Sequence, residues 1–122
     1  SAASDVYKRQ VQRFGHHTHI AANLETGRTH QIRVHMAYRH NPLIGDPVYG
    51  GRPRIPKGAS DELIETLRGF RRQALHARAL GLDHPSTGEA MRFECPIPTD
   101  IAQLLAILER EDPPLRHDAP AY

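Results

Sequence analysis

The segment richest in groups that could do chemistry runs from Arg28 to His35. It gathers arginine, threonine, histidine and glutamine side chains, with Arg33 near its C-terminal end. Arginine stays charged and presents a planar fork of N–H donors, which matches the geometry of carboxylates and phosphates. The segment therefore predicts a site that holds an anion.

The residues from Thr29 to Arg39 fit two conformations, and Arg33 has a different role in each. In a strand, Arg33 points away from the apolar side chains and is an ordinary surface residue. In a helix, Ile32, Met36 and Ala37 fall on one apolar arc, and Arg33 lies inside it. A charge withdrawn from water needs a partner, so the helix predicts a carboxylate beside Arg33. The alternative is that Arg33 only extends its charged head to solvent.

No acidic residue near Arg33 in the sequence is an obvious partner. Asp46 lies beyond Pro42, and its place between Gly45 and Pro47 predicts a turn-forming residue whose side chain bonds nearby backbone. We therefore expect the partner carboxylate to come from elsewhere in the fold, either within these residues or in sequence outside them.

The elements that must position Arg33 suggest an α+β fold, an antiparallel sheet with helices packed on it. Ser60 predicts a helix N-cap, followed by acidic residues that suit a helix start. Apolar spacing predicts one buried face for that helix, formed by Leu63, Ile64, Leu67 and Phe70, and one for the last helix, formed by Ile101, Leu104, Leu105 and Leu108. The expected elements are a strand at 17–24, the ambiguous segment 29–39, a loop at 41–58 with a short strand at 43–44, a helix from 61, a hairpin of strands 73–82 and 89–97, and a helix from 99.

The composition fits one small domain or a piece of a larger one. The 122 residues include 39% hydrophobic and 25% charged side chains, enough for a modest core. The net charge of +2 does not by itself indicate nucleic acid. A local basic cluster could follow a phosphate backbone or could be a solvated face. Its members are Arg52, Arg54, Lys57, Arg68, Arg71 and Arg72.

The cysteine, the histidines and the apolar runs argue against a disulfide-bonded, a zinc-binding and a membrane-spanning protein. The single cysteine, Cys95, allows no internal disulfide, which fits the cytoplasm, and its alternation with Met91 and Phe93 predicts a buried position. The histidines at 16, 17 and 19 match no zinc spacing, so we expect no metal. No apolar run suits a membrane span.

The two ends of the chain are expected to lie outside the fold. Residues 1–10 look like the translation of a sequencing-library adapter at their C-terminal half, and we interpret them as an artefactual leader. Residues 11–112 would form the domain. Residues 113–122 are rich in proline and are predicted to be a disordered tail.

Four segments, in order, resemble motifs of the pseudouridine synthases that modify large-subunit ribosomal RNA. They are GRTHQIRVH at 27–35, HNPLIGDPVYG at 40–50, QALHA at 73–77 and PIP at 96–98. The resemblance extends over residues 12–112 and implies the C-terminal part of that family's catalytic domain, an incomplete one.

The resemblance implies isomerisation of uridine to pseudouridine in 23S ribosomal RNA, which requires no cofactor. In this family an aspartate acts as the nucleophile and an arginine pairs with it, and Arg33 matches that arginine. The nucleophile's H-R-L-D motif does not occur in these residues. We therefore expect Arg33 to be catalytic through an aspartate outside this chain, and the chain alone to be inactive.

Ribosomal RNA is the expected partner, with the target uridine flipped out of the stack. The candidate RNA contacts are Arg28, Gln31, Arg52, Arg54 and Lys57. Arg28 could instead form a structural salt bridge. His30 and His35 are predicted to pack or hydrogen-bond within the fold, and Tyr49 to be structural. Two alternatives remain, a non-catalytic RNA-binding module and a fragment without affinity for RNA.

Overall fold

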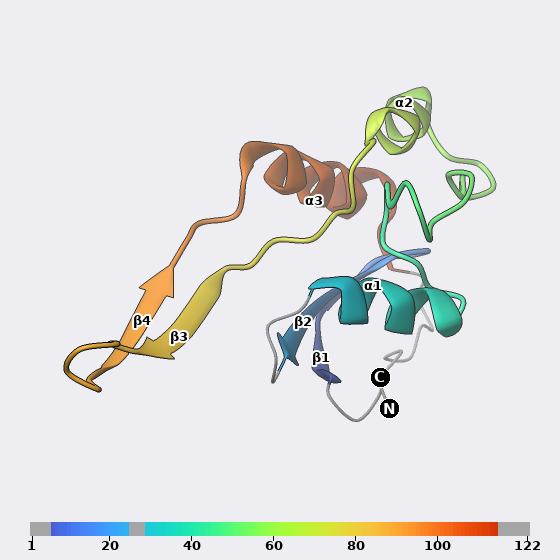
Figure 1. Ribbon diagram of the computed structural model, residues 1–122. Helices are drawn as coiled ribbons and strands as arrows, with labels where there is room; N and C mark the ends of the chain where they lie inside the picture. Colours follow the sequence, from blue (N-terminus) through green and yellow to red (C-terminus); the bar gives the residue numbers. More distant parts are fainter. Residues whose placement is uncertain (1–5, 25–28, 115–122) are drawn as a thin grey trace.

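The computed structural model describes residues 6–24 and 29–114 (Figure 1). The α+β class is confirmed, but the strands form two separate antiparallel hairpins instead of one sheet. The elements in chain order are β1 (Val6–Arg13), β2 (Thr18–Leu24), α1 (Thr29–Tyr38), α2 (Asp61–Gly69), β3 (Ala79–Asp83), β4 (Ala90–Glu94) and α3 (Thr99–Glu111).

The first hairpin pairs β1 with β2 and contains a bulge between Gln10 and Gln12. The strand expected at 17–24 is confirmed as β2, but β1 was not predicted. Residues 6–10, which were expected to lie outside the fold, form the first half of β1. Their backbone groups are satisfied by pairing with β2, which the sequence of either strand alone does not reveal.

The segment 29–39, which fitted both a strand and a helix in the sequence, forms the helix α1. Its apolar side chains share one side, as the helical repeat predicts. Ile32 and Met36 are buried on it. His40 ends the helix in the left-handed region at a φ of 64°. The amides of His40 and Asn41 bond back to the carbonyls of Ala37 and Met36 at 3.0 and 2.9 Å, which is the Schellman arrangement. The chain consequently turns sharply at this point.

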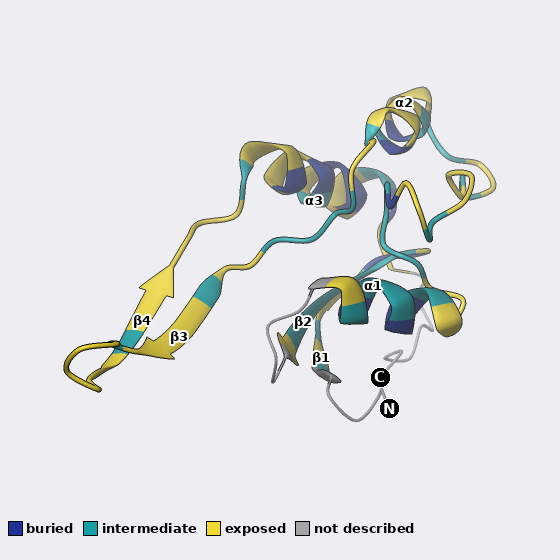
Figure 2. Ribbon diagram, viewed as in Figure 1, coloured by how far each residue is buried: buried dark blue, intermediate teal, exposed yellow. Residues whose placement is uncertain are grey.

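The core lies between α2 and α3 (Figure 2). The Ser60 side chain caps α2 by accepting a bond from the amide of Leu63, as predicted. Leu67 of α2 and Leu104 and Leu108 of α3 are buried together with Phe14, which follows β1. Both helices were predicted with the correct buried face because their apolar spacing matches the helical repeat.

The second hairpin, β3–β4, projects from the rest of the described chain and is mostly exposed (Figures 1 and 2). Its strands are shorter than expected, and the short strand expected at 43–44 is absent from the described residues. Leu80 and Phe93 are 56% and 50% exposed. The prediction that Cys95 is buried is wrong, because no described element covers this hairpin and Cys95 is exposed. A two-stranded hairpin without a packing partner is only marginally stable.

Asp112 ties the end of α3 to the turn between β1 and β2. Its side chain is 4% exposed, and its two oxygens lie 2.8 Å from the Nδ1 atoms of His16 and His17. The His16 amide donates to Oδ2 at 2.9 Å, and the Gly15 amide donates to the Asp112 carbonyl at 2.7 Å. In the described residues no group of histidine, cysteine and acidic side chains could hold a metal. These histidines thus bind a carboxylate.

Replacing Asp112 by asparagine is expected to lower the free energy of unfolding by about 1–3 kcal/mol at neutral pH, because asparagine keeps only one side-chain oxygen and one of the two histidines loses its acceptor. Burial opposes ionisation of Asp112, but the bonds from His17 and His16 outweigh it, so its pKa lies below the ordinary 3.8. The contribution is therefore complete above pH 3.8 and is lost as pH falls through the lower, folded value. Urea unfolding at several pH values measures the difference.

The matched control is Glu94→Gln, which removes a carboxylate from the exposed pair with Arg92. It should change stability by less than about 1 kcal/mol, as is usual for exposed pairs. Equal stabilities of Asp112→Asn and wild type at neutral pH would contradict a structural role for Asp112.

Candidate functional site

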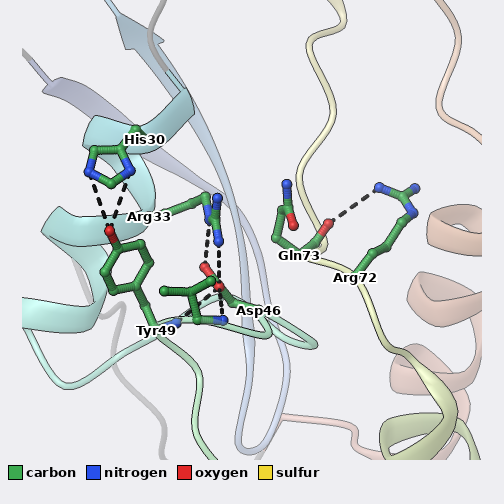
Figure 3. A network of polar contacts seen from close by, with 7 residues as sticks. His30, Arg33, Asp46, Tyr49, Arg72 and Gln73 are labelled. Atoms are coloured by element: carbon green, nitrogen blue, oxygen red, sulfur yellow. Dashed lines mark hydrogen bonds and ion pairs between the residues drawn. The ribbon is translucent and has the colours of Figure 1, made fainter.

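Arg33 of α1 makes a two-armed ion pair with Asp46 (Figure 3). Nε donates to Oδ2 and Nη2 donates to Oδ1, each at 2.8 Å. The side chain of Arg33 is 16% exposed and that of Asp46 is fully buried. Two parallel charge-assisted bonds fix the plane of the guanidinium as well as its position.

The helix predicted a carboxylate beside Arg33, and the structure has one. It is supplied by Asp46, which was not an obvious partner in the sequence. Asp46 is separated from α1 by Pro42 in the sequence. The left-handed turn at His40 reverses the chain and returns Asp46 to the helix. The signal that could have revealed this contact is the demand of Arg33 for a nearby carboxylate, combined with the shortness of the intervening loop.

Asp46 also has the turn-forming role predicted for it. Oδ1 accepts from the amides of Val48 and Tyr49 at 3.0 and 3.1 Å, in addition to the bond from Arg33. The bond from Arg33 is the main cause that lowers the pKa of Asp46 well below its usual range, against the opposing effect of burial. Asp46 therefore stays ionised, and the pair raises the pKa of Arg33.

Gly45 allows the loop to approach the segment that follows α2. Its φ is +75°, and a Cβ at this position would lie 2.3 Å from the carbonyl oxygen of Arg72 and 2.5 Å from that of Phe70. The Ala74 amide donates to the Ile44 carbonyl at 2.8 Å. Only glycine fits here without moving backbone, so the position of Asp46 is set by close packing on both sides.

An aromatic side chain covers the guanidinium. The Cζ atom of Arg33 lies 5.3 Å from the centroid of the Tyr49 ring, within the range of a cation–π contact. His30 packs edge-on against the same ring at 5.5 Å, and its ring nitrogens lie 3.3 and 3.4 Å from the Tyr49 hydroxyl. Tyr49 is thus part of the site's framework, in agreement with its predicted structural role, and His30 contacts it.

His35 lies on the buried side of α1, as predicted for a packing residue. Burial is the main cause that lowers its pKa, and the nearby charges of Lys8 and Arg39 lower it further. Lys8 Nζ lies 2.8 Å from His35 Nε2. His35 is therefore neutral at physiological pH and holds α1 against β1.

Part of the Arg33 guanidinium is not used within the described residues. Arginine carries five N–H groups, and Asp46 receives one from Nε and one from Nη2. Among the residues that the structure describes, Nη1 donates to none. The end formed by Nη1 and the second hydrogen of Nη2 is consequently available to another anion.

Comparison with known proteins shows what this chain is similar to. No protein-family profile matches it. It is 59% identical, over 103 residues, to the ribosomal large subunit pseudouridine synthase D of Pseudomonas aeruginosa. It is 56% and 55% identical, over 103 residues each, to the proteins of the same name from Pasteurella multocida and Escherichia coli. Each match covers 84% of this chain and 32% of the relative.

This chain is homologous to part of the large-subunit pseudouridine synthases. It spans about a third of the length of the curated relatives it matches. The family resemblance seen in the four motifs is confirmed. The insert at 51–60 predicts the D-type enzyme within this family, and the names of the relatives agree with it.

The structure brings together only some of the residues that the sequence predicted to contact RNA. Arg28 lies outside the described residues, and Gln31 is half-buried on α1. Arg52, Arg54 and Lys57 are exposed on the loop after Asp46 and line one groove of about 1720 Å³, together with Arg68 and Arg71.

This groove is larger than the roughly 300–1,000 Å³ typical of small-molecule pockets. Arg72 is not part of it and pairs instead with Asp100 on the surface. Asp46 lines the groove, whereas Arg33 does not. No helix in the described part of the chain is long and apolar enough to cross a membrane.

Gly45→Ala is expected to destabilise the fold more than Gly58→Ala, and the second variant serves as its control. Both glycines have similar positive φ values, +75° and +79°, so both variants bear the left-handed strain of about 1–2 kcal/mol. Only the Cβ at 45 meets backbone, since nothing lies within 4 Å of one at 58. Thermal unfolding of the two variants measures the difference, and equal melting temperatures would contradict the close packing at Gly45.

Proposed function

We propose that this chain is part of an enzyme that isomerises uridine to pseudouridine in 23S ribosomal RNA. Because the chain spans about a third of its relatives' length, the proposed enzyme is a longer protein containing it, which we term the parent enzyme. Residues 11–112 are assigned to its catalytic domain. The observation that carries the proposal is the fixed guanidinium of Arg33, which keeps donors available within a segment that resembles the family's arginine motif.

The reaction breaks the bond from C1′ to N1 of uracil, turns the base, and forms a bond from C1′ to C5. The hydrogen at C5 is released as a proton and N1 gains a proton, so the reaction is an isomerisation that needs no oxidant and no cofactor. An aspartate that attacks as a nucleophile must be ionised and oriented. By binding the nucleophile's carboxylate, the available N–H donors of Arg33 would keep it ionised and fix its orientation.

Asp46 is unsuited to be that nucleophile. Its carboxylate is fully buried, and its two oxygens accept four bonds, two from Arg33 and one each from the amides of Val48 and Tyr49. Neither oxygen is free to attack a substrate. The nucleophile therefore belongs to sequence outside these residues, and the chain alone is inactive.

The proposed substrate is ribosomal RNA, held partly by the basic loop. Arg52, Arg54 and Lys57 stand on the wall of the large groove, where their charges can follow a phosphate backbone. Arg28 and Gln31 are proposed as further contacts near the active site. The cytoplasm is the proposed compartment, where an exposed free thiol such as Cys95 stays reduced.

A second candidate function is RNA binding without catalysis. It is favoured by the basic groove, which is lined by described residues, whereas the nucleophile's H-R-L-D motif does not occur in this sequence. The two functions differ in one outcome, because a binding module would show salt-dependent affinity for RNA without any conversion of uridine.

Arg33→Ala in the parent enzyme should abolish isomerisation and leave RNA binding largely intact, because it removes the donor that orients the nucleophile. Release of tritium from RNA labelled at C5 of uridine measures turnover, and filter binding measures affinity. Arg72→Ala is the matched control, since it removes an arginine from an equally two-armed pair with Asp100 on the surface. Wild-type turnover of Arg33→Ala would refute the assigned role.

Replacing Arg52, Arg54 or Lys57 singly by alanine should weaken RNA binding and flatten its dependence on salt. Each lost phosphate contact reduces the slope of log K against log salt by about 0.7–0.9. Arg110→Ala provides the comparison, because Arg110 is exposed, pairs with Glu62 and lies away from this groove. Unchanged slopes in all three groove variants would show that RNA does not follow this wall.

A further inference from the structure

The N–H donors of Arg33 that remain available to another group depend on how Asp46 binds the guanidinium. Asp46 occupies the side of the guanidinium formed by Nε and Nη2. The end of the same planar group, formed by Nη1 and the second hydrogen of Nη2, can hold a second carboxylate in the same plane. One arginine can therefore bind two carboxylates at once, one at its side and one at its end.

The charges indicate what Asp46 contributes to such an arrangement. Asp46 stays ionised, so it neutralises the charge of Arg33. A second carboxylate is then attracted less strongly than it would be by an unpaired arginine. The benefit that Asp46 can bring is consequently orientation and not attraction.

The surroundings of Asp46 hold its carboxylate in one position, so that it can orient the guanidinium of Arg33. Its carboxylate has no exposed surface, and two backbone amides hold Oδ1 in place. Gly45 packs against the backbone of Phe70 and Arg72, which prevents the loop from shifting. The Tyr49 ring lies over the guanidinium and restricts the remaining rotation about the Arg33 side chain.

We propose that Asp46 is a positioning residue, which together with the Tyr49 ring holds the guanidinium of Arg33 so that its Nη1 end faces the nucleophilic carboxylate of the parent enzyme. This proposal rests on the proposed function. It assigns to Asp46 no contact with the substrate, and its effect on the reaction passes entirely through Arg33.

The test is Asp46→Asn in the parent enzyme. Asparagine retains an oxygen for the amides of Val48 and Tyr49, but it presents an NH₂ group to one arm of Arg33 and removes the neutralising charge. If Arg33 acted only as a positive charge, this variant would be as active as wild type or more so. If orientation matters, kcat should fall by about 100-fold, as misplaced catalytic groups commonly cause, with KM for RNA almost unchanged.

Asp100→Asn is the matched control, because Asp100 accepts the same two-armed bond from Nε and Nη2 of Arg72, at 2.7 and 2.8 Å, on the exposed surface. Its kcat should equal that of wild type. A double-mutant cycle in an Arg33→Lys background supplies the second readout, since lysine keeps the charge but lacks the planar fork, so Asp46→Asn should lower kcat there by less than it does in wild type. Thermal unfolding establishes that each variant is folded at the assay temperature.

Each outcome decides between alternatives. Wild-type kcat in Asp46→Asn overturns the positioning role alone, as does an equal loss of kcat in the wild-type and Arg33→Lys backgrounds. Absence of pseudouridine formation by the wild-type parent enzyme overturns the proposed function, and this proposal with it. If Asp46→Asn fails to fold, Tyr49→Leu removes the covering ring while keeping the backbone bonds of the loop, and an unchanged kcat in that variant also overturns the proposal.

Discussion

The ion pair between Arg33 and Asp46 is the interaction on which the site depends. Removing a carboxylate from water costs several kcal/mol, and attraction to a counter-charge offsets this cost only when the geometry is good and the remaining lone pairs are satisfied. Both conditions hold here, because the two arms measure 2.8 Å and two backbone amides complete the coordination of Oδ1. The pair therefore constrains the helix and the loop to one relative position.

The loop's course is fixed by two backbone positions of unusual conformation. His40 ends α1 with a positive φ, and Gly45 passes close to the segment after α2 with another. Between them the chain reverses, so that Asp46 returns to the helix it has just left. The ion pair and these two turns support each other, since Asp46 reaches Arg33 only along this path.

The sequence predicted well what depends on local patterns. The cap at Ser60 and the apolar spacing of the second and third helices were sufficient to place them, since these signals act within one or two turns. The position of Arg33 on an apolar arc correctly predicted a carboxylate beside it. Its identity was missed because it depends on the reversal of the loop. The burial of Cys95 was predicted wrongly, because alternation indicates a face but not whether another element covers it.

The loop from Asn41 to Gly58 holds two groups of side chains on successive parts. Its first part holds Asp46, which fixes Arg33, and its second part presents Arg52, Arg54 and Lys57 to the groove. Arg54 also donates to the carbonyl of His40 at 2.7 Å, so the basic part of the loop is bonded to the end of α1. One loop therefore places Asp46 and the three basic side chains relative to the same end of α1.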